Sequence, residues 1–122
     1  MIRTFTSRIG NLKKHTDDSR LVRAVYRYVT EHISEPVRTE EIAKALYLSR
    51  SYLSSSFRRQ TGMTLSEYIH RVKIGRAAEL LRDPEKSVAQ IGDYLGYSSP
   101  FHFDRMFRKI MNVSPLAYRR KD

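Results

Sequence analysis

The sequence predicts an all-α protein, and three observations support that prediction. Apolar residues recur at spacings of three and four along most of the chain, as on the buried face of an amphipathic helix. Signals that start and stop helices separate these stretches, and no run alternates apolar and polar residues convincingly enough to indicate a strand. Much of the pattern also occurs twice, so we expect two related helical units and about seven helices in all.

The N-terminal part of the chain is expected to hold a leader or linker and one long helix. Residues 1–16 are basic and lack a capping signal, which is typical of a poorly anchored leader or linker. Asp17 and Asp18 place negative charge where a helix N-terminus favours it, and the helix is expected to end near Pro36. Its inner face would hold the residues at i, i+4, i+7 and i+8, namely Leu21, Val25, Tyr28 and Val29.

Two shorter helices with a tight turn between them are expected next. Thr39 would cap the first of these helices, and a turn around Leu48 would end it. The following helix is expected over about Arg50–Thr61, with Gly62 as a left-handed C-cap. Residues 17–63 would then form a first helix-turn-helix subdomain.

The longest helix is expected to connect this subdomain to the rest of the chain. Thr64 and Glu67 match a capping box, and Asp83-Pro84 would end the helix. A helix over Thr64–Arg82 would be about 28 Å long at ~1.5 Å per residue. Residues 64–83 are therefore expected to form a rigid connecting helix.

The last third of the chain is expected to form three more helices. A second capping box spans Ser87–Gln90, and Gly96 would close the short helix that it begins. A serine cap followed by a proline at the first helical position starts each of the last two helices, at Ser99-Pro100 and Ser114-Pro115. Residues 84–122 would form a second helix-turn-helix subdomain.

The internal repeat gives these elements a functional interpretation. The run from Ile42 to Ser49 returns as Ile91 to Ser98, a shift of 49 residues, and Phe57 returns as Phe107, a shift of 50. Each copy consists of a short helix, a turn and a second helix that ends in basic residues. In a helix-turn-helix the second helix enters the major groove of DNA, so the repeat predicts contact with double-stranded DNA at two places.

Composition supports a polyanionic partner. The 122 residues carry a formal net charge of +10, which attracts nucleic acid or an acidic membrane surface whatever the fold. Because the chain has no cysteine, disulfides and thiolate metal sites are excluded. No apolar run approaches the ~20 residues that span a bilayer, so we expect a cytoplasmic protein with no membrane partner.

The outward faces of the third and sixth helices are the candidate DNA contacts. Leu53, Phe57, Phe103 and Phe107 recur at i and i+4 and must face inward, which leaves an outward stripe on each helix. The candidate base contacts are Arg50, Ser51, Ser54 and Ser55 on the third helix, and Pro100, Phe101, His102 and Arg105 on the sixth. The candidate phosphate contacts are Arg58, Arg59, Arg108 and Lys109.

The connecting helix favours simultaneous contact with two DNA segments. Two recognition helices fit successive major-groove segments on one side of B-DNA when their centres lie about one turn, ~34 Å, apart. A ~28 Å helix with a packed unit at each end spans approximately that distance. We therefore expect one chain to read two adjacent segments, with affinity falling steeply as salt rises.

The roles of several residues can be interpreted in two ways from the sequence. Phe101 would either contact a thymine methyl group or cover the core, and His102 would be either a base or phosphate contact or a plain surface histidine. The basic residues from Arg105 to Lys121, a stretch without an acid, would either contact phosphate or serve as a solvated face. The histidines fall at no metal-ligand spacing and Ser54-Ser55-Ser56 lacks a nucleophile elbow, so we expect no metal, no cofactor and no catalytic residue.

The same residues resemble a known family. The frame Ile91-Gly-x-x-Leu-Gly-Tyr-Ser-Ser-x-x-x-Phe103-x-Arg105-x-Phe107-Arg-Lys, followed by Ser114-Pro-x-x-Tyr118-Arg, is similar to the signature of the AraC/XylS family of bacterial transcription regulators. Its first half is similar to residues from Ile42-Ala through Leu80-Leu81, so the resemblance covers about residues 18–121. A frame of this length is far more specific than a single helix-turn-helix match.

The resemblance implies two helix-turn-helix subdomains that bind an asymmetric promoter site and usually activate transcription by contacting RNA polymerase. The family's base-reading positions fall on Ser51, Ser54 and Ser55 and on the four candidates of the sixth helix. The serines depart from the large polar readers often found there, since a short hydroxyl offers less than the ~1 to 3 kcal/mol of a bidentate pair. Either Arg50 compensates as a longer reader, or the first unit mainly contacts phosphate.

The resemblance also implies what lies beyond this module. Family members often carry a separate sensing and dimerisation domain, which nothing in these residues supplies. The chain is therefore either a short stand-alone regulator or a piece of a longer protein, and we expect the module itself to be monomeric. The alternative from another class is a basic helical adaptor for an acidic protein or membrane surface.

Overall fold

The protein is built from helices alone within its described residues. The computed structural model describes the backbone of residues 12–121 and the side chains of residues 20–120. The helices are α1 (Leu12–Glu31), α2 (Thr39–Ala45), α3 (Arg50–Thr61), α4 (Leu65–Leu80), α5 (Val88–Tyr94), α6 (Pro100–Met111) and α7 (Pro115–Lys121). This confirms the predicted all-α fold with a long helix between two three-helix units, here called the first unit (α1–α3) and the second unit (α5–α7).

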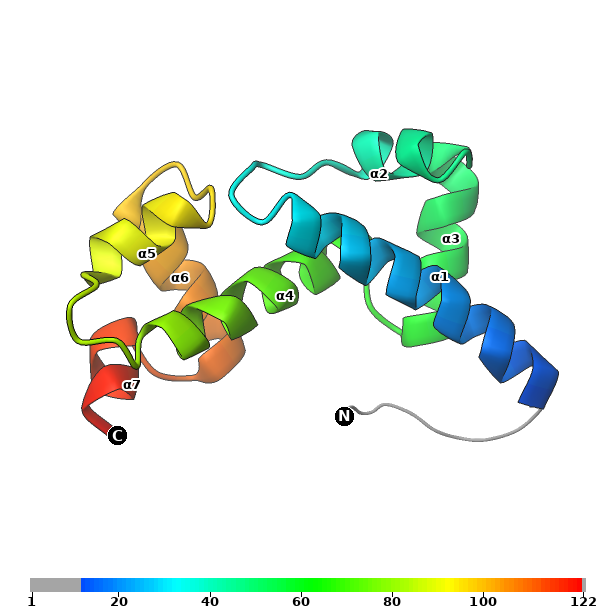
Figure 1. The fold of residues 1–122 in the computed structure, drawn as a ribbon. Helices are drawn as coiled ribbons and strands as arrows, with labels where there is room; N and C mark the ends of the chain where they lie inside the picture. The colour runs from blue at the N-terminus through cyan, green and yellow to red at the C-terminus, as the bar shows by residue number, and fades with distance from the viewer. Residues whose placement is uncertain (1–11, 122) are drawn as a thin grey trace.

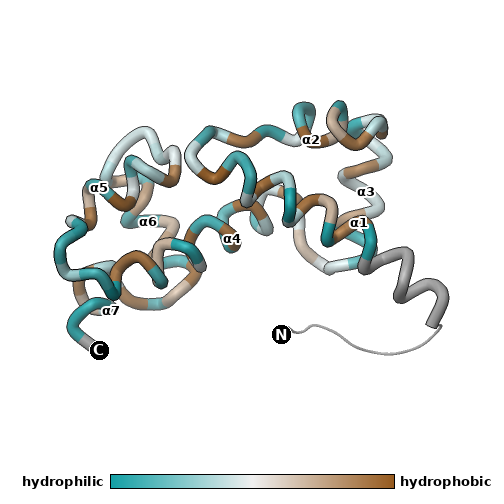
Figure 2. Tube along the Cα trace, in the orientation of Figure 1, coloured by the Kyte–Doolittle hydropathy of each residue, from teal (hydrophilic) through white to brown (hydrophobic). Residues whose placement is uncertain are grey.

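Helix α4 lies between the two units and contributes to both of their cores (Figure 1). Leu65 and Ile69 belong to the core cluster of the first unit, whereas Ile74 and Ala77 belong to that of the second. At 100° per residue, Leu65 and Ile74 point to opposite sides of the helix. The apolar residues of α4 therefore change sides along its length, and apolar segments of the first and second units flank it in Figure 2.

Each core is closed by large side chains from one helix-turn-helix. Phe57 and Phe107 are both fully buried, and they occupy equivalent places in the repeat. Phe57 packs edge-on against Tyr68 at a ring-centroid distance of 5.0 Å, and Phe107 packs edge-on against Tyr118 at 5.6 Å. Such edge-to-face pairs add to the burial of apolar area. Equivalent residues of the sequence repeat therefore make equivalent aromatic contacts in the two cores.

The helix boundaries agree with the sequence signals except at four places. Helix α1 begins at Leu12 and not at Asp17, because leucine and lysine are good helix formers and extend the helix toward the N-terminus. Residues 1–11 of the expected leader lie outside the described part. It ends at Glu31 and not near Pro36, because the His32 amide closes the last turn and Glu35 folds back onto the carbonyl of His32.

The other two differences are in α2 and α4. Thr39 was expected as the cap of α2, but it is the first helical residue and Arg38 is the N-cap, whose backbone amide donates to the Glu41 carboxylate at 3.2 Å. Helix α4 is capped by Thr64 as expected but ends at Leu80, so its 16 residues give a rod of about 24 Å. Its end is held by Arg119, whose guanidinium donates to the carbonyls of Leu81, Asp83 and Lys86.

The two helix-turn-helix turns share a left-handed residue. Gly96 has φ 84° and its repeat counterpart Tyr47 has φ 59°. The N-caps that follow are Ser49 and Ser99, whose side chains accept from the amides of Tyr52 and His102. Because Ser49 and Ser99 lie 50 residues apart while Tyr47 and Gly96 lie 49 apart, the second turn is one residue longer.

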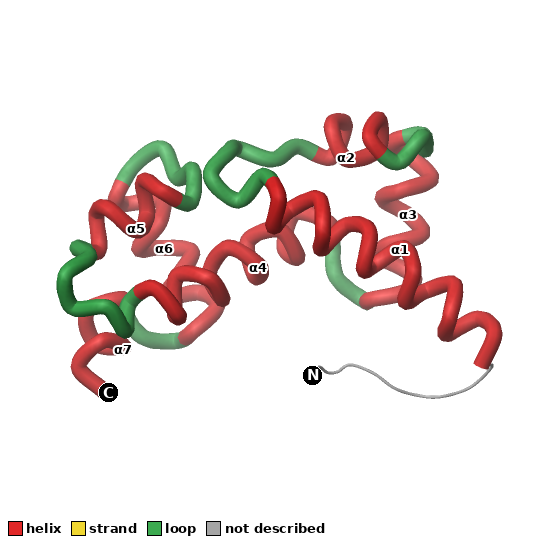
Figure 3. The backbone as a smooth tube through the Cα atoms, in the orientation of Figure 1, coloured by secondary structure: helices red, strands yellow, loops and turns green. Residues whose placement is uncertain are grey.

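The loop between α1 and α2 lies beside the turn between α5 and α6 (Figure 3). The backbone of Gly96 is so close to this loop that a Cβ on it would lie 3.0 Å from the Ser34 carbonyl oxygen. The two units therefore contact each other directly as well as through α4. None of the described helices has the length and apolarity needed to cross a bilayer.

Candidate nucleic-acid interface

Helix α3 presents one exposed stripe. Its apolar Leu53 and Phe57 are fully buried, and the hydroxyl of Ser49 caps its first turn at 3.1 Å from the Tyr52 amide. The predicted base contacts Arg50, Ser51, Ser54 and Ser55 are all exposed. The stripe is continued toward the C-terminal end by the exposed Arg58 and Arg59, so the structure brings all six predicted residues of this helix to its surface.

The hydroxyl groups on α3 are partly occupied by the helix itself. Ser55 donates to the Tyr52 carbonyl at 3.4 Å, and the buried Ser56 accepts from the Arg59 guanidinium at 3.4 Å. Tyr52, which is not among the predicted contacts, exposes 55% of its surface on the same helix. Its signal was present, since it precedes the buried Leu53 by one position and so cannot share its face.

Helix α6 presents the second stripe. Pro100 is its first residue, Ser99 caps it, and Phe103 and Phe107 face the core. Phe101 is 83% exposed, so the interpretation in which it covers the core is wrong. Arg105 lies one turn further along and is also exposed. The aromatic ring and the guanidinium of these two residues are therefore both free to reach a groove.

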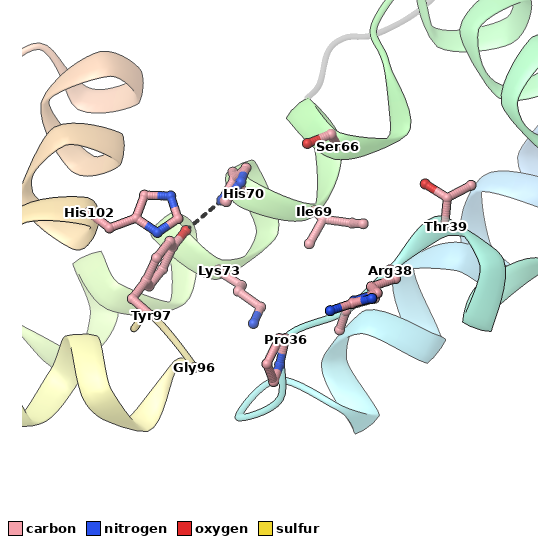
Figure 4. Close-up of a pocket in the computed structure, with 11 residues that line it drawn as sticks. Pro36, Arg38, Thr39, Ser66, Ile69, His70, Lys73, Gly96, Tyr97 and His102 are labelled. Atoms are coloured by element: carbon pink, nitrogen blue, oxygen red, sulfur yellow. Dashed lines mark hydrogen bonds between the residues drawn. The ribbon is translucent and has the colours of Figure 1, made fainter. Parts of the chain in front are cut away.

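His102 is half-buried and belongs to a cluster of rings, so it is not a plain surface histidine. Its ring lies edge-on to Tyr97 at a centroid distance of 5.1 Å and near His70 at 5.9 Å. The hydroxyl of Tyr97 and Nδ1 of His70 share a hydrogen bond of 2.8 Å (Figure 4). Burial lowers the pKa of His70, and the neighbouring charges of His102, Lys73 and Lys109 lower it further.

This cluster lines a cavity between the two units. The cavity has a volume of about 330 Å³ and is bordered by α4, the start of α2 and the turn before α6 (Figure 4). Its polar lining consists of Arg38, Thr39, Ser66, His70, Lys73, Tyr97 and His102, and none of its lining residues is acidic. His102 is thus both a member of the α6 stripe and part of a positively charged surface between the units.

The cations of the second unit divide into exposed and structural ones. Lys109 is exposed, and Arg108 is exposed but forms an ion pair of 2.7 Å with Asp104 one turn earlier. Asp104 is the one acidic residue on either recognition helix. Arg119, which the sequence placed among the basic surface residues, is a half-buried donor to backbone carbonyls of the second unit. Its role in the fold therefore removes it from the candidate surface.

The two recognition helices lie on either side of α4 and run in the same general direction (Figure 1). Both begin with an exposed first turn after a serine cap and both carry their basic pair in the last turn. Among the side chains of residues 20–120, no group of three or more histidines and carboxylates is arranged to hold a metal ion. The structure therefore offers two similarly built, positively charged helix faces.

Comparisons with known proteins agree with this geometry. A family model described as a helix-turn-helix domain matches residues 42–121. The regulatory protein SoxS of Salmonella typhimurium is 34% identical over 101 residues, which are 83% of this chain and 94% of SoxS. The regulatory protein PocR of the same organism is 35% identical over 104 residues, which are 85% of this chain and 34% of PocR.

Solved structures show the same architecture. An AraC-type transcriptional regulator from Chromobacterium violaceum superposes with a TM-score of 0.80 at 29% identity, covering 87% of this chain and 95% of that one. The DNA-binding domain of the transcriptional factor AdpA, solved with a target DNA, superposes with a TM-score of 0.74 at 29% identity, covering 83% and 90%. The chain spans about a third of the length of the first curated relatives that it matches.

Proposed function

The chain belongs to the AraC/XylS family of transcription regulators, as its helix-turn-helix DNA-binding domain, and from this membership we propose that it reads one DNA duplex with both recognition helices at once. Helices α3 and α6 would enter adjacent major-groove segments on one side of the duplex. Residues 17–63 and 84–122 would be the two reading subdomains, and residues 64–83 would set their separation.

The observation that supports this most is the pair of similar exposed stripes on either side of α4. A single helix-turn-helix with a redundant copy would not need both recognition helices to keep an exposed, basic face. Both copies keep it: α3 has Arg58 and Arg59 in its last turn, and α6 has Arg108 and Lys109. AdpA, whose DNA-binding domain has a similar fold, was solved with a target DNA, which favours the same kind of ligand here.

The second unit is proposed to read most of the bases. Arg105 is the residue best suited to it, because a guanidinium can donate two parallel hydrogen bonds to guanine O6 and N7. Phe101 is exposed at the first turn of the same helix and can contact a thymine methyl group. His102 and Pro100 would complete this surface, while Arg108 and Lys109 would contact phosphates.

The first unit is proposed to contribute position more than base selection. Ser51, Ser54 and Ser55 have short side chains, and Ser55 already donates to its own helix. Arg50 is the one long polar side chain in the first turn of α3, so it is the candidate base reader there. Arg58 and Arg59 would neutralise phosphates and add to the salt dependence of binding.

For the whole protein we propose a bacterial transcription regulator, acting as an activator that contacts RNA polymerase from its promoter site. The relatives with similar domains carry the names of regulatory proteins, and most of the length of the first ones lies outside the part that this chain matches. One chain offers two recognition helices, so the module would bind an asymmetric site as a monomer. Such a regulator would work in the cytoplasm, where the bacterial chromosome lies.

A selection of bound duplexes from a random pool tests the proposed function. We expect enriched sequences with a strongly constrained block for the second unit and a weaker block, read by Arg50, about 10 to 11 base pairs away. Binding of the enriched duplex is then compared with a scrambled duplex and with anionic lipid vesicles at the same salt concentration. If scrambled DNA, vesicles and the enriched duplex bound equally well, the chain would be a basic adaptor and the proposal would be wrong.

A further inference from the structure

Lys73 is a buried lysine at the contact between the two units. It lies on α4 with only 4% of its surface exposed. Its ammonium group donates to the backbone carbonyl of Glu35 at 2.6 Å and to that of Leu95 at 2.7 Å. Glu35 lies in the loop that leads into α2, and Leu95 is the C-cap of α5 at the start of the turn into α6. The Lys73 side chain therefore bonds both to the loop that precedes the first helix-turn-helix and to the turn within the second.

The ammonium group is held by these carbonyls and not by an ion pair. Within the described side chains no carboxylate lies within 4 Å of Lys73, and the carboxylate of Glu35 pairs with His32 at 3.1 Å instead. Burial lowers the pKa of the Lys73 ammonium, although the charge of Glu35 acts in the opposite direction. A buried charge is costly unless it is hydrogen-bonded, so any movement of either unit that breaks these bonds is opposed.

Gly96 shows that the contact is close on both sides of Lys73. A Cβ at Gly96 would lie 3.0 Å from the Ser34 carbonyl oxygen and 3.1 Å from Nζ of Lys73. Its repeat counterpart in the first unit is Tyr47, which is 95% exposed. The two copies of the repeat thus differ at this turn. The turn between α5 and α6 packs against the other unit, and glycine at position 96 permits that close approach of the backbones.

We propose that Lys73 is a positioning residue that fixes the orientation of α6 relative to α3 and thereby sets the spacing of the two DNA segments that the module accepts. This rests on the proposed reading of two segments. Helix α4 contributes to both cores, and Ile33 packs against both of them. Lys73 adds hydrogen bonds from α4 to the loop before α2 and to the turn before α6. These bonds would hold the two recognition helices in one fixed relation.

Distance measurements on the free protein test the fixed orientation without DNA. Because the chain has no cysteine, Lys44→Cys on α2 and Asp93→Cys on α5 introduce two spin-label sites, both at exposed positions away from the recognition helices. We expect a narrow distance distribution, which Lys73→Met broadens at least twofold and Lys73→Arg leaves narrow. Lys86→Met, which removes an exposed lysine of the second unit, is the matched control and should leave the distribution narrow.

DNA duplexes with altered spacing test the consequence for recognition. Each inserted base pair turns one segment relative to the other by about 34°. The starting protein and Lys73→Arg should lose at least tenfold in affinity when one base pair is inserted or removed between the two segments. Lys73→Met should bind the original duplex about tenfold more weakly, because a loose connection lowers the effective concentration of the second unit. Its affinities for the three spacings should lie within about threefold of one another.

A duplex with a single segment separates this role from a general loss of structure. Lys73→Met should bind it within twofold of the starting protein, since each unit keeps its own core. If Lys73→Met lowered affinity for one-segment and two-segment duplexes equally, or kept a sharp preference for one spacing, the positioning role would be overturned. A narrow distance distribution in Lys73→Met would overturn it as well.

Gly96→Ala probes the same contact if Lys73→Met does not unfold cooperatively. The added methyl group would lie 3.0 Å from the Ser34 carbonyl oxygen and 3.1 Å from Nζ of Lys73, at a φ of 84° that strains an alanine, so it should broaden the distances and flatten the spacing preference in the same way. If it did neither, the proposal would be overturned. Should the random-pool selection yield a single segment, the two-segment function would fail, whereas the distance measurements would still decide whether Lys73 fixes the units.

Discussion

Tyr47 and Gly96 occupy the same place in the two helix-turn-helix turns and both have a left-handed backbone, with φ 59° and 84°. A non-glycine residue in this conformation costs roughly 1 to 2 kcal/mol, whereas glycine has no such cost. The tyrosine side chain is 95% exposed, so burial of its ring offsets little of this cost. The backbone of the turn between α2 and α3 is therefore more strained than that of the turn between α5 and α6.

Tyr47→Gly should stabilise the protein. Relief of the left-handed strain exceeds the extra backbone entropy of glycine, so the free energy of unfolding should rise by about 0.5 to 1 kcal/mol. Urea denaturation followed by circular dichroism measures the change. Tyr47→Ala keeps the strain and removes the ring, and it should leave stability nearly unchanged. If Tyr47→Gly were less stable than the starting protein, the tyrosine ring would make a stabilising contact despite its exposure, and the prediction would be wrong.

Arg105 and Lys109 should contribute differently to DNA binding. Arg105→Ala should lower affinity for the selected site by about 1 to 3 kcal/mol and relax one base position, because it removes a bidentate base contact. Lys109→Ala should weaken all duplexes alike and reduce the salt slope by about one. Fluorescence anisotropy on the selected and scrambled duplexes at several salt concentrations measures both. Equal losses on the two duplexes for Arg105→Ala would assign that residue to the backbone.

Arg119 should matter for stability and not for DNA. Arg119→Met removes the guanidinium donor from the Leu81 carbonyl and leaves the Asp83 carbonyl with the Lys86 amide alone, so the free energy of unfolding should fall by about 1 to 2 kcal/mol. Arg120→Met is the matched control on the exposed side of α7 and should change stability by less than about 0.5 kcal/mol. Thermal and urea denaturation of both variants provide the comparison. Equal stability of the two variants would mean that solvent replaces the guanidinium without cost.

His70 should make stability depend on pH below about 6.5. Its pKa is lowered in the folded protein, first by burial and then by His102, Lys73 and Lys109, so the unfolded chain takes up its proton first as pH falls. Above the unfolded-state pKa of about 6.5, His70 is neutral in both states and does not lower the free energy of unfolding. As the pH falls below about 6.5, the free energy of unfolding decreases. Urea denaturation at pH 7.5 and pH 5.5 measures the decrease.

His70→Gln isolates this contribution. The variant should lose less stability between the two pH values than the starting protein, because its amide does not titrate. The lowered carboxyl pKa values of Glu67 and Asp83 act in the same direction only at lower pH and remain in both proteins. If His70→Gln had an unchanged pH dependence, another group would be responsible.

Much of the fold could be predicted from local signals. The serine and threonine caps at Thr64, Ser87 and Ser99 begin their helices as expected, and Gly62 ends α3 in the left-handed conformation. These signals are short-range hydrogen bonds and backbone preferences, so they can be read from neighbouring residues. The start of α1 could not be, because the acidic pair Asp17-Asp18, which was expected to mark a helix start, lies inside the helix, which begins at Leu12.

The contact between the units was not predictable in the same way. Lys73 reads as one more exposed lysine of a basic chain, and its burial depends on carbonyls 38 and 22 residues away. Arg119 also reads as part of a basic surface, yet it bonds to carbonyls more than 30 residues earlier. Long-range contacts of this kind have no periodic pattern. The exposure of the candidate base contacts other than His102 could be predicted, because the buried residues of α3 and α6 leave only one outward stripe. Their contact with bases remains a prediction.

Affinity cleavage tests most directly whether the two recognition helices occupy adjacent grooves of one duplex. Ser51→Cys and Phe101→Cys, at equivalent exposed positions in the first turns of α3 and α6, each accept an iron chelate, since the chain has no other cysteine. On the selected duplex the two cleavage centres should lie about 10 to 11 base pairs apart, on the same side of the DNA. Cleavage by only one of the two variants, or cleavage of the same segment by both, would contradict the account.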